Sequence, residues 1–192
     1  MPKRAALDAC ACPAKRVHQT HLHKLDMVDL SEFHSRLFIG SQAAAKAVAD
    51  SGEQGWLGVC MAGGSIAVQG FNVEEGVIEF EDSSVVPGPD AARFHEAVRK
   101  GSAAIERALA SAEGPNVLVY CKLGRNRSAA AAVGWATAHG QWCAPAAVNY
   151  VQDQRTKALS NTDFVIHLTL TTSSERLKRR RCSPPLCETP PA

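Results

Sequence analysis

The sequence predicts an α/β domain in which a central, mostly parallel sheet is flanked by helices. Short apolar runs of strand length alternate with segments of helical periodicity along most of the chain, an order typical of such a sheet. One apolar run stops at Cys121, where a turn containing glycine leads into an alanine-rich helix. The 192 residues, 45% of them hydrophobic, can bury one substantial core, whereas two full domains would be cramped.

The first half of the chain is expected to supply short elements and then one long helix. The strands are apolar runs bounded by glycine or polar residues, and the helices repeat apolar residues every three or four positions. Asp90 precedes the long helix and is a suitable N-cap for it. In chain order we expect strand Leu37–Ile39, helix Ala43–Ser51, strand Trp56–Met61, strand Val77–Glu81 and helix Ala91–Ala112.

The second half is expected to contain one buried strand and three helices. The uninterrupted apolar run from Val117 to Tyr120 indicates the strand. The turn that follows leaves the carboxyl end of this strand, where open α/β sheets place their binding sites. The helices are expected at Ser128–His139, Ala144–Gln154 and Thr162–Leu177.

The turn from Cys121 to Ser128 has the residues needed to hold a phosphate against a thiolate. It lies at a helix N-terminus, where unpaired N–H groups and the helix dipole favour an anion and lower the pKa of a nearby thiol. Gly124 permits tight curvature, so that successive amides can point inward. The planar guanidinium of Arg127 can hold two phosphate oxygens at once. Ser128 can donate its hydroxyl to the sulfur or act as an N-cap.

These residues resemble a known family. Cys121 to Ser128 matches the C-x5-R-[ST] signature of cysteine-dependent protein tyrosine phosphatases, and the chain resembles their small dual-specificity branch. The resemblance covers roughly Leu30 to Leu170 in the family's order, and it implies a protein tyrosine phosphatase-like fold. The other matching segments are Leu37–Gln42, Ile78–Ser83, Arg155 and Ser160–Phe164.

The resemblance implies an enzyme that hydrolyses phosphotyrosine and phosphoserine/threonine in proteins through a phosphocysteine intermediate, with no metal or other cofactor. Cys121 would be the nucleophile, and Asp82 the general acid that becomes the base of the second step. Ser128 would assist departure of the thiolate, and Asn161 would brace the loop. The phosphate would be bound by the loop residues Lys122, Leu123, Gly124, Arg125, Asn126 and Arg127.

Two features depart from the family pattern. Tyr120 stands where the family usually has histidine, so a catalytically weak pseudophosphatase that binds phosphorylated partners is an alternative. The family's acid usually lies about thirty residues before the cysteine, a distance that Asp90 fits better than Asp82. We favour Asp82 because it follows the predicted strand and precedes Ser83, as in the family's acid loop.

The substrate class has two candidates. Lys122 and Arg125 add positive charge to the loop, and basic residues there also occur in relatives that act on phosphoinositides or phosphatidylglycerophosphate. Acidic residues before Asp82 would repel a highly anionic headgroup, namely Glu74, Glu75, Glu79 and Glu81. We therefore favour a phosphoprotein over a phospholipid.

The two ends of the chain differ in composition from its centre. Residues 1–26 and 175–192 each carry five basic and two acidic residues, so each segment has a net charge of +3. Because the whole chain has a net charge of +2, the centre must have a net charge of −4. We therefore expect disordered basic tails around a catalytic domain at 27–174, and no nucleic-acid partner. The basic run Lys178–Arg181 makes a nuclear location an alternative to the expected cytoplasmic one. No membrane-spanning run is visible, and the oligomeric state stays open.

Overall fold

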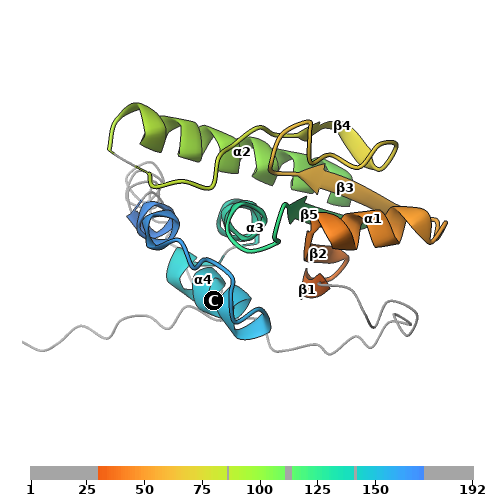
Figure 1. The fold of residues 1–192 in the computed structure, drawn as a ribbon. Helices are drawn as coiled ribbons and strands as arrows, with labels where there is room; N and C mark the ends of the chain where they lie inside the picture. Colours follow the sequence, from red (N-terminus) through yellow and green to blue (C-terminus); the bar gives the residue numbers. More distant parts are fainter. Residues whose placement is uncertain (1–29, 86, 111–113, 141, 171–192) are drawn as a thin grey trace, which may run out of the picture.

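The chain folds around a five-stranded sheet with the strand order β1-β2-β5-β3-β4 (Figure 1). The computed structural model describes residues 30–85, 87–110, 114–140 and 142–170. The strands are β1 Leu30–His34, β2 Leu37–Ser41, β3 Trp56–Cys60, β4 Asn72–Val77 and β5 Asn116–Cys121. The helices are α1 Gln42–Asp50, α2 Pro89–Leu109, α3 Arg127–Ala138 and α4 Ala144–Gln154, and residues 162–170 are also helical.

The predicted fold class is confirmed: the sheet is mostly parallel and has helices on both faces. The central strand β5 runs parallel to β2 and β3, and β3 runs parallel to β4, while β1 is antiparallel to β2 at one edge. In this register Ser41 at the end of β2 lies beside Cys121 at the end of β5. The carboxyl ends of the parallel strands therefore meet where the sequence predicted the site.

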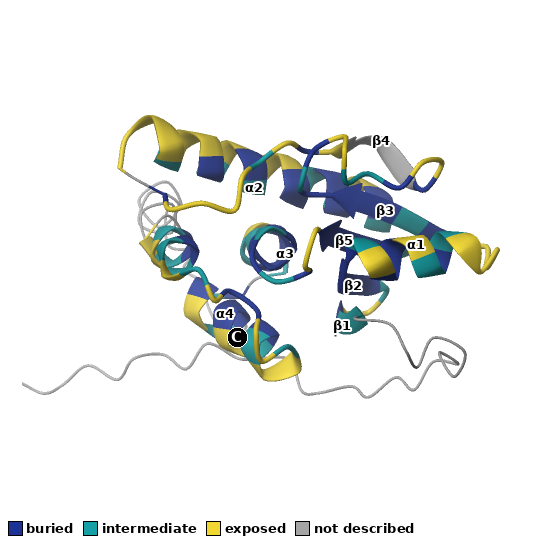
Figure 2. Ribbon diagram, in the orientation of Figure 1, coloured by how far each residue is buried: buried dark blue, intermediate teal, exposed yellow. Residues whose placement is uncertain are grey.

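Two hydrophobic clusters hold the helices to the sheet, one on each face. The larger contains Val119 and Cys121 of β5 together with the buried faces of α2, α3 and α4. The smaller contains Leu118 and Tyr120 of β5 and packs against α1. Because successive side chains of a strand point to opposite faces, Cys121 and Tyr120 belong to different clusters. Figure 2 shows α3 almost wholly buried beside β5, whereas α2 keeps an exposed outer face.

Three details of the predicted elements are wrong. The strand expected at Val77–Glu81 lies earlier, since β4 ends at Val77 and the following residues leave the sheet to contact the turn after β5. Edge strand β1 was not predicted, because its alternation of half-buried polar and apolar residues is short. Helix α2 begins at Pro89 and its N-cap is Gly88, not Asp90; proline is favoured at a first helical position because its φ is already helical.

Several predictions fall outside the described residues. The domain limits at 26/27 and 174/175, both tails and the basic run Lys178–Arg181 are among them. The same holds for the last residues of the helix expected to end at Leu177, and for the side chains of Glu74 and Glu75. The helix expected to end at Ala112 ends earlier, at Leu109. Among the described residues, no helix is long and apolar enough to cross a membrane.

Candidate active site

Cys121 is the last residue of the central strand β5, and the turn between β5 and α3 wraps around its sulfur. This turn, Cys121 to Ser128, is called the signature loop below. Gly124 in its middle has a φ of 64°, and a Cβ on this residue would lie 2.5 Å from the carbonyl carbon of Gly40. Only glycine fits here, because the loop turns with a positive φ directly against the backbone at the end of β2.

The thiol of Cys121 is buried, with 1% of the residue exposed, yet its pKa is lowered. Burial on its own opposes the thiolate and raises the pKa. Hydrogen bonds from the hydroxyl and backbone amide of Ser128 and the amide of Arg125, and the charge of Arg127, act in the opposite direction and prevail. The Ser128 Oγ lies 3.5 Å from the sulfur. The surroundings of Cys121 therefore favour a nucleophilic thiolate.

The guanidinium of Arg127 joins the signature loop to the segment that follows β4. We call this segment, Ile78–Val85, the acid loop. Arg127 Nη1 donates to the carbonyl oxygen of Phe80 at 2.7 Å. Its Nε is buried and has no hydrogen-bond partner among the described residues. A buried donor without a partner is costly, and an oxygen of a phosphoryl group held by the loop would satisfy it.

The carboxylate of Asp82 lies against the signature loop. Asn126 Nδ2 donates to both of its oxygens, at 3.1 and 3.0 Å, and Asn161 Nδ2 donates to one of them at 3.4 Å. Asp90, in contrast, is exposed in the first turn of α2, where its nearest ionic partner is Arg93 at 4.0 Å. The structure thus brings Asp82, and not Asp90, beside the loop that contains Cys121.

The start of the helical segment 162–170 fixes the acid loop from the other side. Asn161 Nδ2 also donates to the carbonyl oxygen of Ser83 at 3.0 Å, and Asp163 accepts a hydrogen bond from the backbone N–H of Val85 at 3.1 Å. Asn161 Oδ1 accepts from the N–H of Asp163 at 3.1 Å, which orients the asparagine. Asn161 therefore contacts the acid loop directly, in addition to the signature loop that it was predicted to brace.

Arg155 supports the signature loop from behind. Its Nε donates to the carbonyl oxygen of Gly124 at 3.0 Å, and its Nη1 donates to the carbonyl oxygen of Ile39 at 3.4 Å. The backbone N–H of Leu159 donates to the carbonyl oxygen of Arg125 at 3.0 Å. With its carbonyls held on the outside, the loop turns its amides inward, as an anion site requires.

Comparison with known proteins agrees with this geometry. The family model described as "Dual specificity phosphatase, catalytic domain" matches residues 85–173. The solved structure of human DUSP28 is similar, with 25% identity over 77% of this chain and 95% of that one, and a TM-score of 0.52. The human tyrosine phosphatase-like serine/threonine/tyrosine-interacting protein has 20% identity over 77% and 97% of the two chains, with a TM-score of 0.57. No curated protein sequence matches.

Residues 85–173, which include the signature loop, thus match the catalytic domain of the dual-specificity phosphatases. The match covers somewhat less than half of the chain, and the solved phosphatase structures share its fold. A third similar structure, PTPMT1 in complex with PI(5)P, has 15% identity over 79% of this chain and 99% of that one, with a TM-score of 0.51. At that identity the similarity concerns the fold alone.

The side chain of Tyr120 does not face the thiol of Cys121, because the two residues belong to clusters on opposite faces of the sheet. The Tyr120 side chain is fully buried on the α1 face of the sheet, where its hydroxyl accepts a hydrogen bond from the backbone N–H of Val68 at 2.8 Å. Burial raises the pKa of the neighbouring Cys60 thiol, which therefore remains protonated. The groups that lower the pKa of Cys121 are Ser128, Arg125 and Arg127, all of which belong to the signature loop.

Cavities lie beside the signature loop and the acid loop in the described part of the chain. One, of about 910 Å³, lies between the acid loop and α2 and has acidic and basic residues in equal number: Glu79, Glu81, Asp90 and Glu96 with Arg93, Arg99, Lys100 and Arg107. Another, of about 400 Å³, is lined by Ser31, Arg125, Gln154, Arg155, Thr156 and Lys157 and has no acidic residue. The domain therefore offers one mixed and one cationic surface near its loops.

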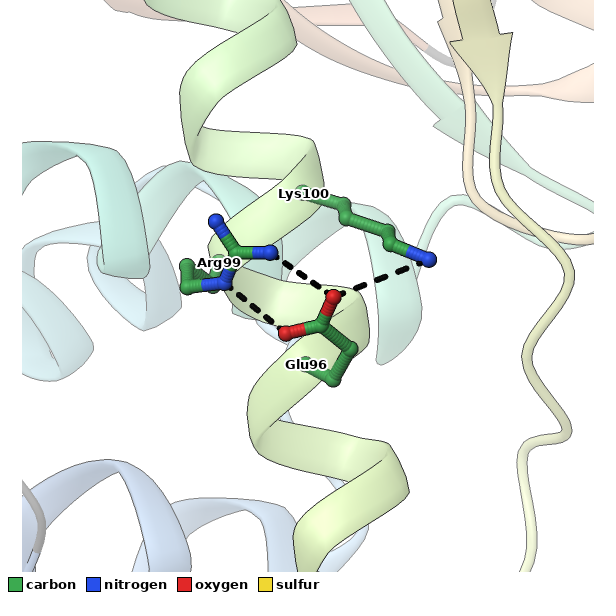
Figure 3. Close-up of polar contacts among 3 residues, drawn as sticks. All are labelled: Glu96, Arg99 and Lys100. Carbon is green, nitrogen blue, oxygen red and sulfur yellow. Dashed lines mark hydrogen bonds and ion pairs between the residues drawn. The ribbon is translucent and has the colours of Figure 1, made fainter.

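The charges of the larger cavity partly neutralise one another. Glu96 contacts Arg99 at 2.7 Å and Lys100 at 3.6 Å along the outer face of α2 (Figure 3). The pKa of Glu96 is lowered, chiefly by the hydrogen bond from Arg99. These groups are exposed, so their ion pairs add little to stability. Among the described residues, no group of three histidine, cysteine or acidic side chains could hold a metal ion.

Residues from four separate parts of the chain thus meet at the carboxyl ends of the parallel strands. Sequence reasoning named most of them but missed the side-chain role of Asn126 and the contribution of Asp163. Their hydrogen bonds join residues 44 and 78 positions apart, so no local pattern could have indicated them. The only sequence signal was the matched segment Ser160–Phe164, which placed Asp163 in the family's late motif.

Proposed function

We propose that this domain hydrolyses phosphotyrosine and phosphoserine/threonine in proteins through a phosphocysteine intermediate on Cys121. The observation that supports the proposal is the contact between the Asp82 carboxylate and Asn126 of the signature loop, the same loop that contains Cys121 with its lowered pKa. Nucleophile, phosphate-binding arginine and acid are the three groups that such a reaction needs.

In the first step the Cys121 thiolate attacks phosphorus in line with the leaving oxygen. The S–P bond forms as the P–O bond to the substrate alcohol breaks. Protonated Asp82 gives its proton to the departing oxygen. The loop amides and the Nε of Arg127 stabilise the charge on the equatorial oxygens, which a loop already held in place can do without reorganisation.

In the second step the phosphocysteine is hydrolysed. Asp82, now ionised, takes a proton from a water molecule whose oxygen attacks phosphorus, and the S–P bond breaks to release inorganic phosphate. The electron pair returns to the sulfur, and the Ser128 hydroxyl stabilises the leaving thiolate across the 3.5 Å contact. The enzyme then regains its starting state.

A phosphoprotein suits the surface around the site better than a phospholipid headgroup. The large cavity beside the acid loop presents both signs of charge, as a peptide with mixed side chains would require. Glu79 and Glu81 are exposed on the acid loop itself, and they would repel a headgroup with several phosphates. Leu123 is 53% exposed on the signature loop and offers an apolar contact for a peptide.

The test is hydrolysis of a small aryl phosphate by the wild type and three variants. Cys121→Ser should abolish activity, and Asp82→Asn should lower it by about 10²-fold or more on a substrate with a poor leaving group. Asp90→Asn is the matched control, since it removes a carboxylate that lies outside the site, and it should retain activity. A wild type no faster than Cys121→Ser would instead make the domain a pseudophosphatase that only binds phosphorylated partners.

A second candidate substrate, a phosphoinositide or phosphatidylglycerophosphate, is favoured by the smaller cavity. Arg125, Arg155 and Lys157 line it without any acidic residue, and Lys122 is exposed nearby on the signature loop. Phosphopeptides, PI(5)P and phosphatidylglycerophosphate should therefore be compared at equal concentration. Our proposal predicts the highest kcat/KM for a phosphopeptide, and preference for either lipid would reverse the assignment.

A further inference from the structure

The side chain of Asn126 links three segments that are distant in the sequence. Its Nδ2 donates to both oxygens of Asp82, at 3.1 and 3.0 Å. Its Oδ1 accepts from the backbone N–H of Asn161 at 3.1 Å and from the hydroxyl of Ser160 at 3.3 Å. Asn126 itself is only 9% exposed, whereas Asp82 and Ser160 are exposed, and the four hydrogen bonds hold its amide in one orientation.

That orientation is dictated by the partners. The N–H of Asn161 can only donate, so the amide oxygen must face it, and the amide nitrogen must then face Asp82. Asp82 is an exposed residue in a stretch without strand or helix. The hydrogen bond that Asp82 accepts from Asn161 is longer, at 3.4 Å. Asn126 is therefore the main tether of this carboxylate.

We propose that Asn126 is a positioning residue that holds Asp82 where its proton can reach the leaving oxygen. Asn126 directly precedes Arg127 in the signature loop, so the tether fixes the acid relative to the phosphate site itself. The inference rests on the proposed function, since it assigns a role in that reaction. It adds that the acid is placed by the side chain of a residue whose backbone belongs to the phosphate-binding loop.

The leaving group provides the test, because only a basic leaving group needs a proton in the transition state. We expect Asn126→Ala to lower kcat/KM about tenfold or more on phenyl phosphate, and much less on 2,4-dinitrophenyl phosphate. Ser160→Ala is the matched control. It removes one hydrogen bond from the same asparagine but keeps both contacts to Asp82, so its loss should be smaller and similar on the two substrates.

A double-mutant cycle separates positioning from a general disturbance of the loop. In the Asp82→Asn background, Asn126→Ala should cause little further loss of kcat/KM on phenyl phosphate. The asparagine at position 82 has no acidic proton to give to the leaving oxygen, so its position no longer matters for that step. Asn126→Ser provides a second variant if alanine lowers the unfolding temperature, and it should give the same dependence on the leaving group. Equal losses on both substrates, or losses that multiply in the cycle, would refute the positioning role.

The two proposals fail in different ways. If wild type and Cys121→Ser are equally slow on both substrates, the proposed catalytic function is wrong, and the role of Asn126 falls with it. If hydrolysis depends on Cys121 and Asp82 but the effect of Asn126→Ala is independent of Asp82, only the positioning role is wrong.

Discussion

At the scale of single residues, the ionisation of Cys121 decides whether the domain can act. Its pKa is lowered although burial opposes this, since Ser128, Arg125 and Arg127 favour the thiolate more strongly. The thiolate should therefore be present at a lower pH than in an ordinary cysteine. We expect alkylation of Cys121 by iodoacetamide to reach its plateau below the usual pH range of thiols.

The hydroxyl of Ser128 should account for part of this effect. Ser128→Ala removes a hydrogen bond that stabilises the thiolate, so the alkylation curve should move to higher pH and turnover of the intermediate should slow. Cys121→Ser identifies which thiol is being alkylated. Coinciding pH curves for wild type and Ser128→Ala would show that the hydroxyl does not control the thiol.

At the scale of elements, the signature loop depends on the close approach of Gly124 to the end of β2. A methyl group here would meet the backbone of Gly40 and Ser41 at 2.5 to 2.7 Å. We expect Gly124→Ala to displace the loop and lower kcat/KM by about 10²-fold, the cost of misplacing reacting groups by about 1 Å. Its unfolding temperature should also fall.

Gly52 offers the matched control for this substitution. Its φ of 68° is close to that of Gly124, but a Cβ there would have nothing within 4 Å. Gly52→Ala therefore carries the same backbone penalty without the clash and without contact with the site. If the two variants lost activity equally, the close approach of Gly124 to β2 would not be what shapes the loop.

The elements differ in how far their sequence predicts them. The strand ending at Cys121 and the helices at 127–138 and 144–154 follow from local patterns, because a buried apolar run and helical periodicity are local signals. The acid loop does not. Its course depends on Arg127, Asn161 and Asp163, which lie far away in sequence. Local spacing also favoured Asp90, whereas the tertiary contacts place Asp82 beside the signature loop.

At the scale of the whole molecule, α3 supports the site only if it packs closely against α2. Gly134 of α3 allows this contact, because a Cβ there would lie 2.4 Å from Cγ1 of Val98. We expect Gly134→Leu to lower the free energy of unfolding by about 1–2 kcal/mol, since overpacking outweighs the better helix propensity. Ala138→Leu changes an exposed position of the same helix and should stay within about 0.5 kcal/mol of wild type.

Chemical denaturation of the three proteins measures this difference. An unfolding free energy of Gly134→Leu equal to that of Ala138→Leu would mean that α2 and α3 can separate without cost. Activity should follow stability in this pair, because neither position touches the site and α3 begins at Arg127.

In the proposed reaction, Cys121 carries the phosphoryl group between the two steps. The most direct measurement is rapid acid quenching of the enzyme during turnover of an aryl phosphate, followed by mass spectrometry of the peptide that contains Cys121. We expect one phosphoryl group on Cys121 in the wild type and none in Cys121→Ser. Turnover without any covalent phosphate on Cys121, or with phosphate on another residue, would contradict it.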